Sequence, residues 1–408
     1  MASILLKDIK EVYKIPQGNK PNSILIQDDV IQSIGPYNDI IKTMDGISES
    51  GSQIMDCTNV ILMPGFIDSH THLLFAGSRE DELYMRAEGR PYLDILESGG
   101  GIYNTVEAVR KASEEELVEN GMHYLDKALQ LGITTAEIKS GYGLDYENEK
   151  KMLKVINRLN DLHPVDVIPT FLVHSVPKES DREDFIDQVV NRMIPEFRDY
   201  AEWFDIFLEK NVFELSEGEL LIRHARDAGY HVGIHTNQVH DIGGIKLADE
   251  LGVRHVNHLE VLTEEDAKRI RENENMYAVF LPTAEAYVFS EHVGQIRQLL
   301  DIPDRLVLSS DFNPGSSPVL SPFFVMSQAL LLYRISSASL LLNSMTSNPA
   351  AMLYLNDRGL IEEGKKADLI ALELDNFNQV PYLGTLPVIE MVMKNGKIYQ
   401  SSRIKDKG

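Results

Sequence analysis

The sequence predicts an α/β fold in which a (β/α)8 barrel of the TIM type is joined to a small β-sandwich domain formed by both chain termini. Three observations predict it. Short apolar runs alternate eight times with amphipathic stretches in the middle of the chain, which is typical of such barrels. Both ends contain strand-like segments, and 408 residues suffice for a large domain with an accessory unit. The expected divisions are residues 1–62 and 357–408 for the small domain and residues 63–356 for the barrel.

The terminal segments show the alternation of strands that bury one face. Residues 23–27 and 30–34 are separated by two aspartates, which predicts a hairpin. Residues 367–374 and 388–399 alternate in the same way near the other end. Within the last of these, Asn395-Gly396 is typical of a type I′ turn between two strands.

The eight apolar runs are the expected barrel strands, and helical stretches follow most of them. The runs are residues 65–68, 133–138, 165–173, 203–208, 231–235, 255–259, 276–281 and 306–310. The expected helices include residues 147–162, 181–201, 214–228 and 264–273. No long linker and no internal repeat interrupts this alternation.

The composition excludes several classes of protein. There are 39 basic against 63 acidic residues, a formal net charge of −24, which argues against binding to nucleic acid or to an anionic membrane. Cys57 is the single cysteine, so a disulfide scaffold is excluded and a reducing compartment is favoured. We see no signal peptide and no apolar run of the ~20 residues that span a bilayer. We expect a cytoplasmic protein.

The histidines point to a site at one end of the expected barrel. In such barrels the chemistry gathers where strands end at their carboxyl side. Five of the twelve histidines lie at or just beyond such ends, namely His70, His72, His174, His235 and His258. For the other seven, position alone favours a surface or packing role.

The pair His70 and His72 predicts a metal centre. Residues i and i+2 of an extended segment point the same way, so both imidazoles can converge on one ion. His235, His258 and Asp311 follow later strands and can join them. Imidazole and carboxylate suit zinc or iron, and the lack of thiolates argues against a structural zinc cage. We therefore expect a mononuclear hydrolytic centre.

Several motifs together carry a family resemblance that covers nearly the whole chain. The first resembles the opening motif of the amidohydrolase superfamily, and the others narrow the resemblance to the imidazolonepropionase family. They are Pro64-Gly65-Phe66-Ile67-Asp68-Ser69-His70-Thr71-His72, its continuation Leu73-Leu74-Phe75-Ala76-Gly77-Ser78-Arg79-Glu80, Gly99-Gly100-Gly101-Ile102, Lys139-Ser140-Gly141-Tyr142-Gly143-Leu144 and Asp311-Phe312-Asn313-Pro314-Gly315-Ser316-Ser317.

The resemblance implies a reaction, a cofactor and a partner. The reaction is hydrolysis of the cyclic amide C–N bond of 4-imidazolone-5-propanoate to N-formimidoyl-L-glutamate, the third step of histidine degradation. It implies one zinc or iron ion per subunit, a small anionic substrate and a homodimer. It also implies roles for residues: His70, His72, His235 and Asp311 on the metal, His258 beside the scissile carbonyl with Asp311 moving the proton, and Arg79, Tyr92, Tyr142, His174, Gln238, Asn313, Gly315 and Ser316 around the substrate.

Other interpretations remain open for single residues. Arg79 lies in an acidic run and could neutralise it, since exposed ion pairs are common. Tyr142 could close the barrel mouth, and His174 could be structural. Asn313 with Gly315 fits an ordinary turn as well as a binding loop. The segment 99–101 could be a lid hinge or only a loop.

Two departures separate this chain from related enzymes. Binuclear amidohydrolases bridge two metals with a carbamylated lysine after the fourth strand, where this chain has Lys210 two residues beyond the apolar run, so we expect one metal. Deaminases of the superfamily carry a glutamate three residues after the third histidine ligand. Here Gln238 stands in that place, and an amide cannot shuttle a proton. The alternatives are thus a deaminase and, from another class, a barrel that assembles without catalysis.

Overall fold

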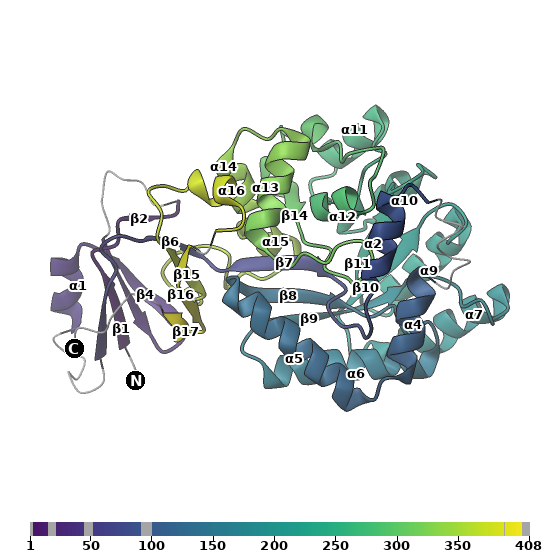
Figure 1. Cartoon of the computed structure of the whole chain (residues 1–408), viewed down its shortest axis with the longest axis horizontal. Coiled ribbons are helices and arrows are strands. Elements are labelled where there is room, and N and C mark those ends of the chain that lie inside the picture. Colours follow the sequence, from purple (N-terminus) through teal and green to yellow (C-terminus); the bar gives the residue numbers. More distant parts are fainter. Residues whose placement is uncertain (1–2, 15–21, 45–51, 91–99, 387, 402–408) are drawn as a thin grey trace.

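The computed structural model describes residues 3–14, 22–44, 52–90, 100–386 and 388–401. It consists of a barrel and of two smaller sheets that contain strands from both ends of the chain (Figure 1). In Figure 1 the smaller sheets lie on the left and the barrel, ringed by helices, on the right.

The barrel strands occur in the order of the sequence, and the prediction of eight parallel strands is confirmed. Each strand pairs in parallel with the next, from the first to the eighth. Their side chains are almost all buried, as expected for strands covered on both faces. The strands are β7 (Phe66–Thr71), β8 (Ile133–Lys139), β9 (Asp166–Val173), β10 (Trp203–Leu208), β11 (His231–Thr236), β12 (His255–His258), β13 (Tyr277–Phe280) and β14 (Leu306–Leu308).

Helices between the strands cover the outside of the barrel. Two of the helices expected from the sequence begin at well-formed caps: Asp145 accepts from the backbone of Asn148, and Thr263 forms a reciprocal capping box with Asp266. The α-helices of this part of the chain are α2 (Glu80–Ala87), α4 (Ile102–Lys111), α5 (Glu114–Gln130), α6 (Tyr146–Leu162), α7 (Arg182–Gln188), α8 (Ile194–Phe197), α9 (Leu215–Asp227), α10 (Gly244–Leu251), α11 (Glu264–Glu272), α12 (Pro282–Tyr287), α13 (Pro322–Tyr333), α14 (Ala338–Asn343) and α15 (Ser347–Met352).

The stretch expected as one helix over residues 181–201 is divided. A π-helical turn, Val189–Met193, separates α7 from α8. Pro195 stands at the start of α8 and has no N–H to donate to the preceding turn. A wider turn before this proline lets the chain continue around it.

The terminal segments form two mixed sheets. One has the order β4-β3-β1-β5 and the other β17-β16-β15-β6-β2. The expected hairpins are present: β3 pairs antiparallel with β4, and β16 with β17 through Asn395 and Gly396, both at positive φ. The strands are β1 (Ser3–Lys7), β2 (Glu11–Val12), β3 (Ser23–Gln27), β4 (Val30–Gly35), β5 (Ser52–Asp56), β6 (Ile61–Pro64), β15 (Leu369–Leu372), β16 (Ile389–Lys394) and β17 (Lys397–Ser401).

These two sheets share a core of their own. Leu6 and Ile24 of the first sheet pack in one cluster with Leu62, Leu369 and Met391 of the second. The remaining helices, α1 (Tyr37–Met44) and α16 (Gln379–Leu383), belong to the same terminal segments. β6 joins N-terminal sequence to the C-terminal strand β15. The domain boundaries after residues 62 and 356 stay a prediction.

No helix in the described ranges combines the length and the apolar character that crossing a bilayer requires.

Candidate active site

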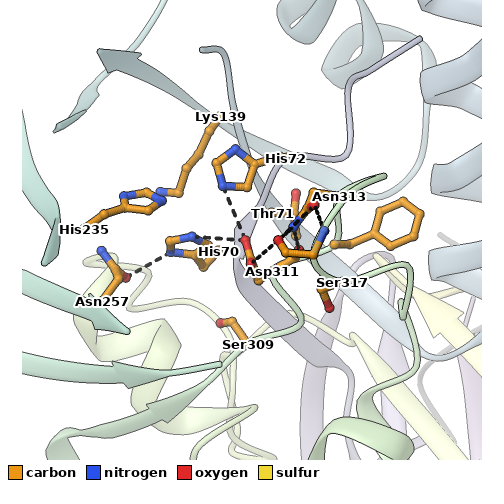
Figure 2. A network of polar contacts seen from close by, with 12 residues as sticks. His70, Thr71, His72, Lys139, His235, Asn257, Ser309, Asp311, Asn313 and Ser317 are labelled. Carbon is orange, nitrogen blue, oxygen red and sulfur yellow. Dashed lines mark hydrogen bonds and ion pairs between the residues drawn. The ribbon is translucent and has the colours of Figure 1, made fainter. Parts of the chain in front are cut away.

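Three histidines meet at the carboxyl end of the barrel strands. β7 contains His70, His72 follows its last residue, and β11 contributes His235. One nitrogen from each ring lies within 4.8 Å of the corresponding nitrogens of the other two, and all three side chains are buried. Figure 2 shows the three rings gathered around one position next to Asp311.

Hydrogen bonds fix the orientation of two of these rings. His70 Nδ1 lies 3.0 Å from Oδ1 of Asn257, and His235 Nδ1 lies 2.9 Å from Oδ1 of Asp205. Asn257 donates its amide N–H to Ile234, so its oxygen faces the ring. Both Nδ1 atoms therefore carry the proton, and the lone pair of each Nε2 points toward the shared position.

Those Nε2 atoms are buried and make no hydrogen bond to any described residue. Burial lowers the pKa of His70 well below its usual value and that of His235 to about 4, so both rings are neutral. Buried polar atoms are rarely left without a partner. Neutral imidazoles that share unsatisfied nitrogens fit the needs of a metal ion, and the residues of this site therefore fit the expected cofactor.

Asp311 reaches the same position because of the way the barrel closes. After β14 the backbone N–H of Asp311 donates to the carbonyl of His70, and that of His72 donates to the carbonyl of Phe312. Asp311 Oδ1 lies 3.6 Å from His70 Nε2 and 3.4 Å from His72 Nε2. Burial would raise the pKa of Asp311, but the neighbouring histidines hold it below its usual value, so the carboxylate stays charged.

His258 ends β12, and its ring lies beside those of His70 and His235, with centroids 6.0 Å and 5.4 Å away. Its Nδ1 is 3.3 Å from Oε1 of the buried Glu260. Burial would lower the pKa of His258, but Glu260 and other carboxylates raise it above its usual value. His258 and Leu259 both have positive φ, 83° and 71°, which turns the chain sharply out of the strand.

Tyr142, in the loop after β8, and His174, directly after β9, both lie beside the ring of His72. The ring of His72 is 5.8 Å from that of Tyr142 and 6.1 Å from that of His174. Burial raises the pKa of Tyr142, which keeps the phenol neutral. The loop of Tyr142 is held by Glu149, whose carboxylate accepts the backbone N–H groups of residues 141, 143 and 144.

Arg79 pairs with Glu82 and also faces the loop after β14. Its Nε and Nη2 each lie 2.8 Å from a carboxylate oxygen of Glu82. The guanidinium packs so closely on Gly315 that a Cβ there would lie 2.2 Å from Nη1. Arg86 approaches the same carboxylate at 3.8 Å and donates to the Gly315 carbonyl. The neutralising interpretation of Arg79 thus describes one of its contacts, while Gly315 provides a second one at the site.

Asn313 stabilises the turn that follows Asp311. Its Oδ1 accepts the N–H groups of Gly315 at 2.9 Å and Ser316 at 2.7 Å, and its Nδ2 donates to the Asp311 carbonyl. Ser316 Oγ lies 3.5 Å from Asp311 Oδ2. The turn therefore fixes the loop in which Asp311, Gly315 and Ser316 occur.

The residues that remain from the sequence analysis are Gln238, Tyr92, Gly99 and Lys210. Gln238 is partly buried in the loop after β11. Tyr92 and Gly99 lie outside the described residues. Lys210 is exposed beyond the end of β10, far from the buried environment that a bridging lysine would need.

Sequence reasoning missed the residues that orient the expected ligands. Asn257, Asp205 and Glu260 each bond to an Nδ1 atom at the site. A signal was available for Asp205, which is a charged residue inside an otherwise apolar strand, a position that is costly without a partner.

Comparison with known proteins gives the class first. Residues 78–400 match the model of the amidohydrolase family. Among solved structures, the triazine hydrolase from Arthobacter aurescens has a TM-score of 0.69 at 16% identity and covers 98% of this chain and 95% of its own. An A. niger ochratoxinase has a TM-score of 0.68 at 17% identity, covering 98% and 96%. At such identities these two structures support the fold alone.

Curated relatives are much more similar. The imidazolonepropionase of Alkaliphilus metalliredigens is 37% identical over 100% of this chain and 99% of its own. That of Bacillus cytotoxicus is 38% identical over 85% and 82%. The chain belongs to the imidazolonepropionase family and is a hydrolase of histidine degradation.

Proposed function

We propose that the chain hydrolyses the ring amide of 4-imidazolone-5-propanoate and releases N-formimidoyl-L-glutamate. The observation that carries this proposal is the group of buried His70, His72 and His235 beside the charged Asp311, in a member of this family. A site with three imidazoles and one carboxylate suits one zinc or iron ion.

The proposed ligands are His70, His72, His235 and Asp311. A bound zinc or iron ion supplies Lewis-acid chemistry and lowers the pKa of a water molecule from about 15.7 to near 7, which makes hydroxide available at neutral pH. Asn257 and Asp205 hold the Nε2 lone pairs of His70 and His235 in position before any ion arrives. Such partners raise the basicity of the ligands and limit their rotation.

Asp311 and His258 would share the proton and charge transfers. Asp311 Oδ2 can take the proton of the attacking water and return it to the ring nitrogen that leaves. Glu260 accepts the Nδ1–H of His258 and raises the pKa of the ring, which favours the imidazolium form. The Nε2–H of that form can donate to the carbonyl oxygen of the substrate as negative charge develops there. Asp311 as proton carrier and His258 as donor are thus complementary roles.

The propanoate tail needs a cationic partner in a chain of net charge −24. Arg79 and Arg86 bring two guanidinium groups to the site, where both approach the carboxylate of Glu82. Arg79 can pair with the tail carboxylate, and Ser316 and the neutral Tyr142 can donate hydrogen bonds. His174 and Gln238 would line the ring, with Gly315 leaving room for Arg79 and Asn313 shaping the loop.

The direct test follows the ultraviolet absorbance of enzymatically prepared imidazolone propionate. Wild-type protein should remove the absorbance and produce N-formimidoyl-L-glutamate, identified by mass. His235→Ala, which removes one proposed ligand, is the matched control and should be inactive. Stable absorbance with wild-type protein, or release of ammonia from cytosine, adenine or guanine, would favour the deaminase alternative instead.

We also infer a cytoplasmic homodimer that binds no nucleic acid or membrane. The family supports the dimer. The single cysteine supports a cytoplasmic location, and the acidic composition argues against binding to nucleic acid or membrane. Sedimentation in solution tests the dimer, with a monomer as the contrary result.

A further inference from the structure

Lys139 is fully buried at the end of β8, next to the three histidines. Its Nζ lies 2.8 Å from Oε1 of Glu137 and 2.9 Å from Oδ2 of Asp205. All three side chains are almost completely excluded from solvent. Figure 2 shows the lysine extending toward His235. Nothing in the hydrolysis described above uses this ammonium group.

The Glu137 carboxylate connects Lys139 to the segment at the end of β7 that carries His70 and His72. The pairing of β7 with β8 becomes irregular between Asp68 and Thr71, so the regular ladder fails where the histidines occur. There Glu137 Oε2 accepts the backbone N–H of Thr71 at 3.2 Å, and Thr71 Oγ1 donates to the Glu137 carbonyl at 2.7 Å. Thr71 lies between His70 and His72, so this bond fixes the segment that presents both rings.

The Asp205 carboxylate connects the same lysine to the third histidine. Oδ2 of Asp205 accepts from Lys139, and Oδ1 accepts the Nδ1–H of His235 at 2.9 Å. Without the ammonium, two buried carboxylates would remain without a shared counter-charge, and each would be free to take a different partner.

We propose that Lys139 is a positioning residue that joins the His70–His72 segment and His235 into one preorganised set of metal ligands, through Glu137 and Asp205. This inference rests on the proposed function, because it assumes that the three histidines hold a metal ion. Lys139 itself contacts neither ion nor substrate; it determines how well the ligands are aligned before binding.

The test measures zinc affinity of the metal-free protein by competition with a chromophoric chelator. The variant is Lys139→Met. Its matched control is Lys394→Met, because Lys394 is also fully buried between two carboxylates, Asp166 and Asp368, outside this site. Both variants should melt at lower temperature than wild type. Only Lys139→Met should bind zinc more weakly, by roughly 10–100-fold, the usual effect of losing an outer-shell partner.

Two further variants serve if Lys139→Met does not fold. Glu137→Gln and Asp205→Asn keep the side-chain shape, and each weakens one of the two connections from Lys139 to the ligands. Each should therefore also weaken zinc binding. Wild-type zinc affinity in Lys139→Met, or in both Glu137→Gln and Asp205→Asn, would overturn the positioning role while leaving the proposed function intact. Wild-type protein that binds no metal would overturn the proposed function itself, and with it this inference.

Discussion

Lys139 and Lys394 are buried alike between two carboxylates, but they lie at opposite ends of the barrel. Lys139 ends β8, whereas the partner of Lys394, Asp166, begins β9. The Lys139 carboxylates bond onward to a ligand segment and a ligand ring. The Lys394 carboxylates bond onward to other cations, Arg358 and Lys366, and to the backbone of Asn395.

The difference shows what each buried cluster accomplishes. At the end of β8 the network leaves Nε2 of His70 and of His235 without a hydrogen bond to any described residue, as a binding site requires. At the start of β9 it joins the barrel to β15 and β16 of the terminal sheet, since Asp368 precedes β15 and Lys394 ends β16. In barrels of this type, chemistry occurs at the carboxyl end of the strands and stability is served at the other end.

The largest effect is expected where the comparison places the chemistry. His235→Ala and Asp311→Ala each remove a proposed ligand and should lower kcat by several orders of magnitude. The metal-free variants should unfold at nearly the wild-type denaturant concentration, because the ligand side chains are held by the barrel and do not hold it. Steady-state kinetics and urea unfolding measure the two effects. A variant that retained most of its activity would remove that residue from the centre.

At the other end of the barrel, we expect a large loss of stability with unchanged activity. Lys394→Met removes the ammonium from the buried Asp368, and breaking a buried pair costs about 3–5 kcal/mol of unfolding free energy. The loss should not exceed this range, because the partly exposed Asp166 keeps Arg358 and Lys366 as partners. Urea unfolding measures the loss, while kcat per folded molecule should stay at the wild-type value. Reduced kcat at full folding would mean that the two ends are not independent.

A smaller effect is expected for the proposed tail-binding residue. Arg79→Met should lower kcat/KM by a factor worth about 2–5 kcal/mol, mostly through KM if the contact is equal in ground and transition states. Arg158→Met is the matched control. Arg158 pairs with the carboxylate of Glu115, but on the exposed surface, where such pairs are worth about 0–1 kcal/mol. Equal kinetics for both variants would return Arg79 to a purely neutralising role with Glu82.

The smallest effect is expected at Gln238, which lies in the loop after β11. Its carbonyl oxygen can accept from a ring N–H, and a carboxylate can accept the same bond. Gln238→Glu should therefore remain within roughly tenfold of wild type, a change of about 1.4 kcal/mol. Gln238→Ala leaves a ring atom unpaired and should cost about 1–3 kcal/mol. Equal rates for Gln238→Ala and wild type would show that this side chain does not contact the ring.

The sequence was sufficient for the barrel and for the histidines of the site. Strand and helix alternate clearly, and His70, His72 and His235 follow apolar runs whose ends meet by topology alone. Asp311 could be expected after the last strand, although its contact with His72 depends on how the first and eighth strands bond at closure.

The charged side chains that support the histidines, namely Glu137, Lys139 and Asp205, could not be predicted in the same way. Glu137 and Lys139 alternate with Ile138, which in a single strand is typical of an exposed face. Only the closed barrel makes that face internal, where Asp205 from another strand meets it. The π-helical turn before Pro195 was missed for a related reason, since a proline in an amphipathic stretch does not specify how the chain accommodates it.

The central claim is that this end of the barrel holds one catalytic metal ion. Metal-free enzyme should be titrated with zinc or ferrous iron while ring opening and bound metal per chain are both measured. Activity should rise in proportion to metal and level off at about one ion per chain, the number that four converging ligands hold. Full activity without metal, or saturation only at two ions per chain, would contradict the account.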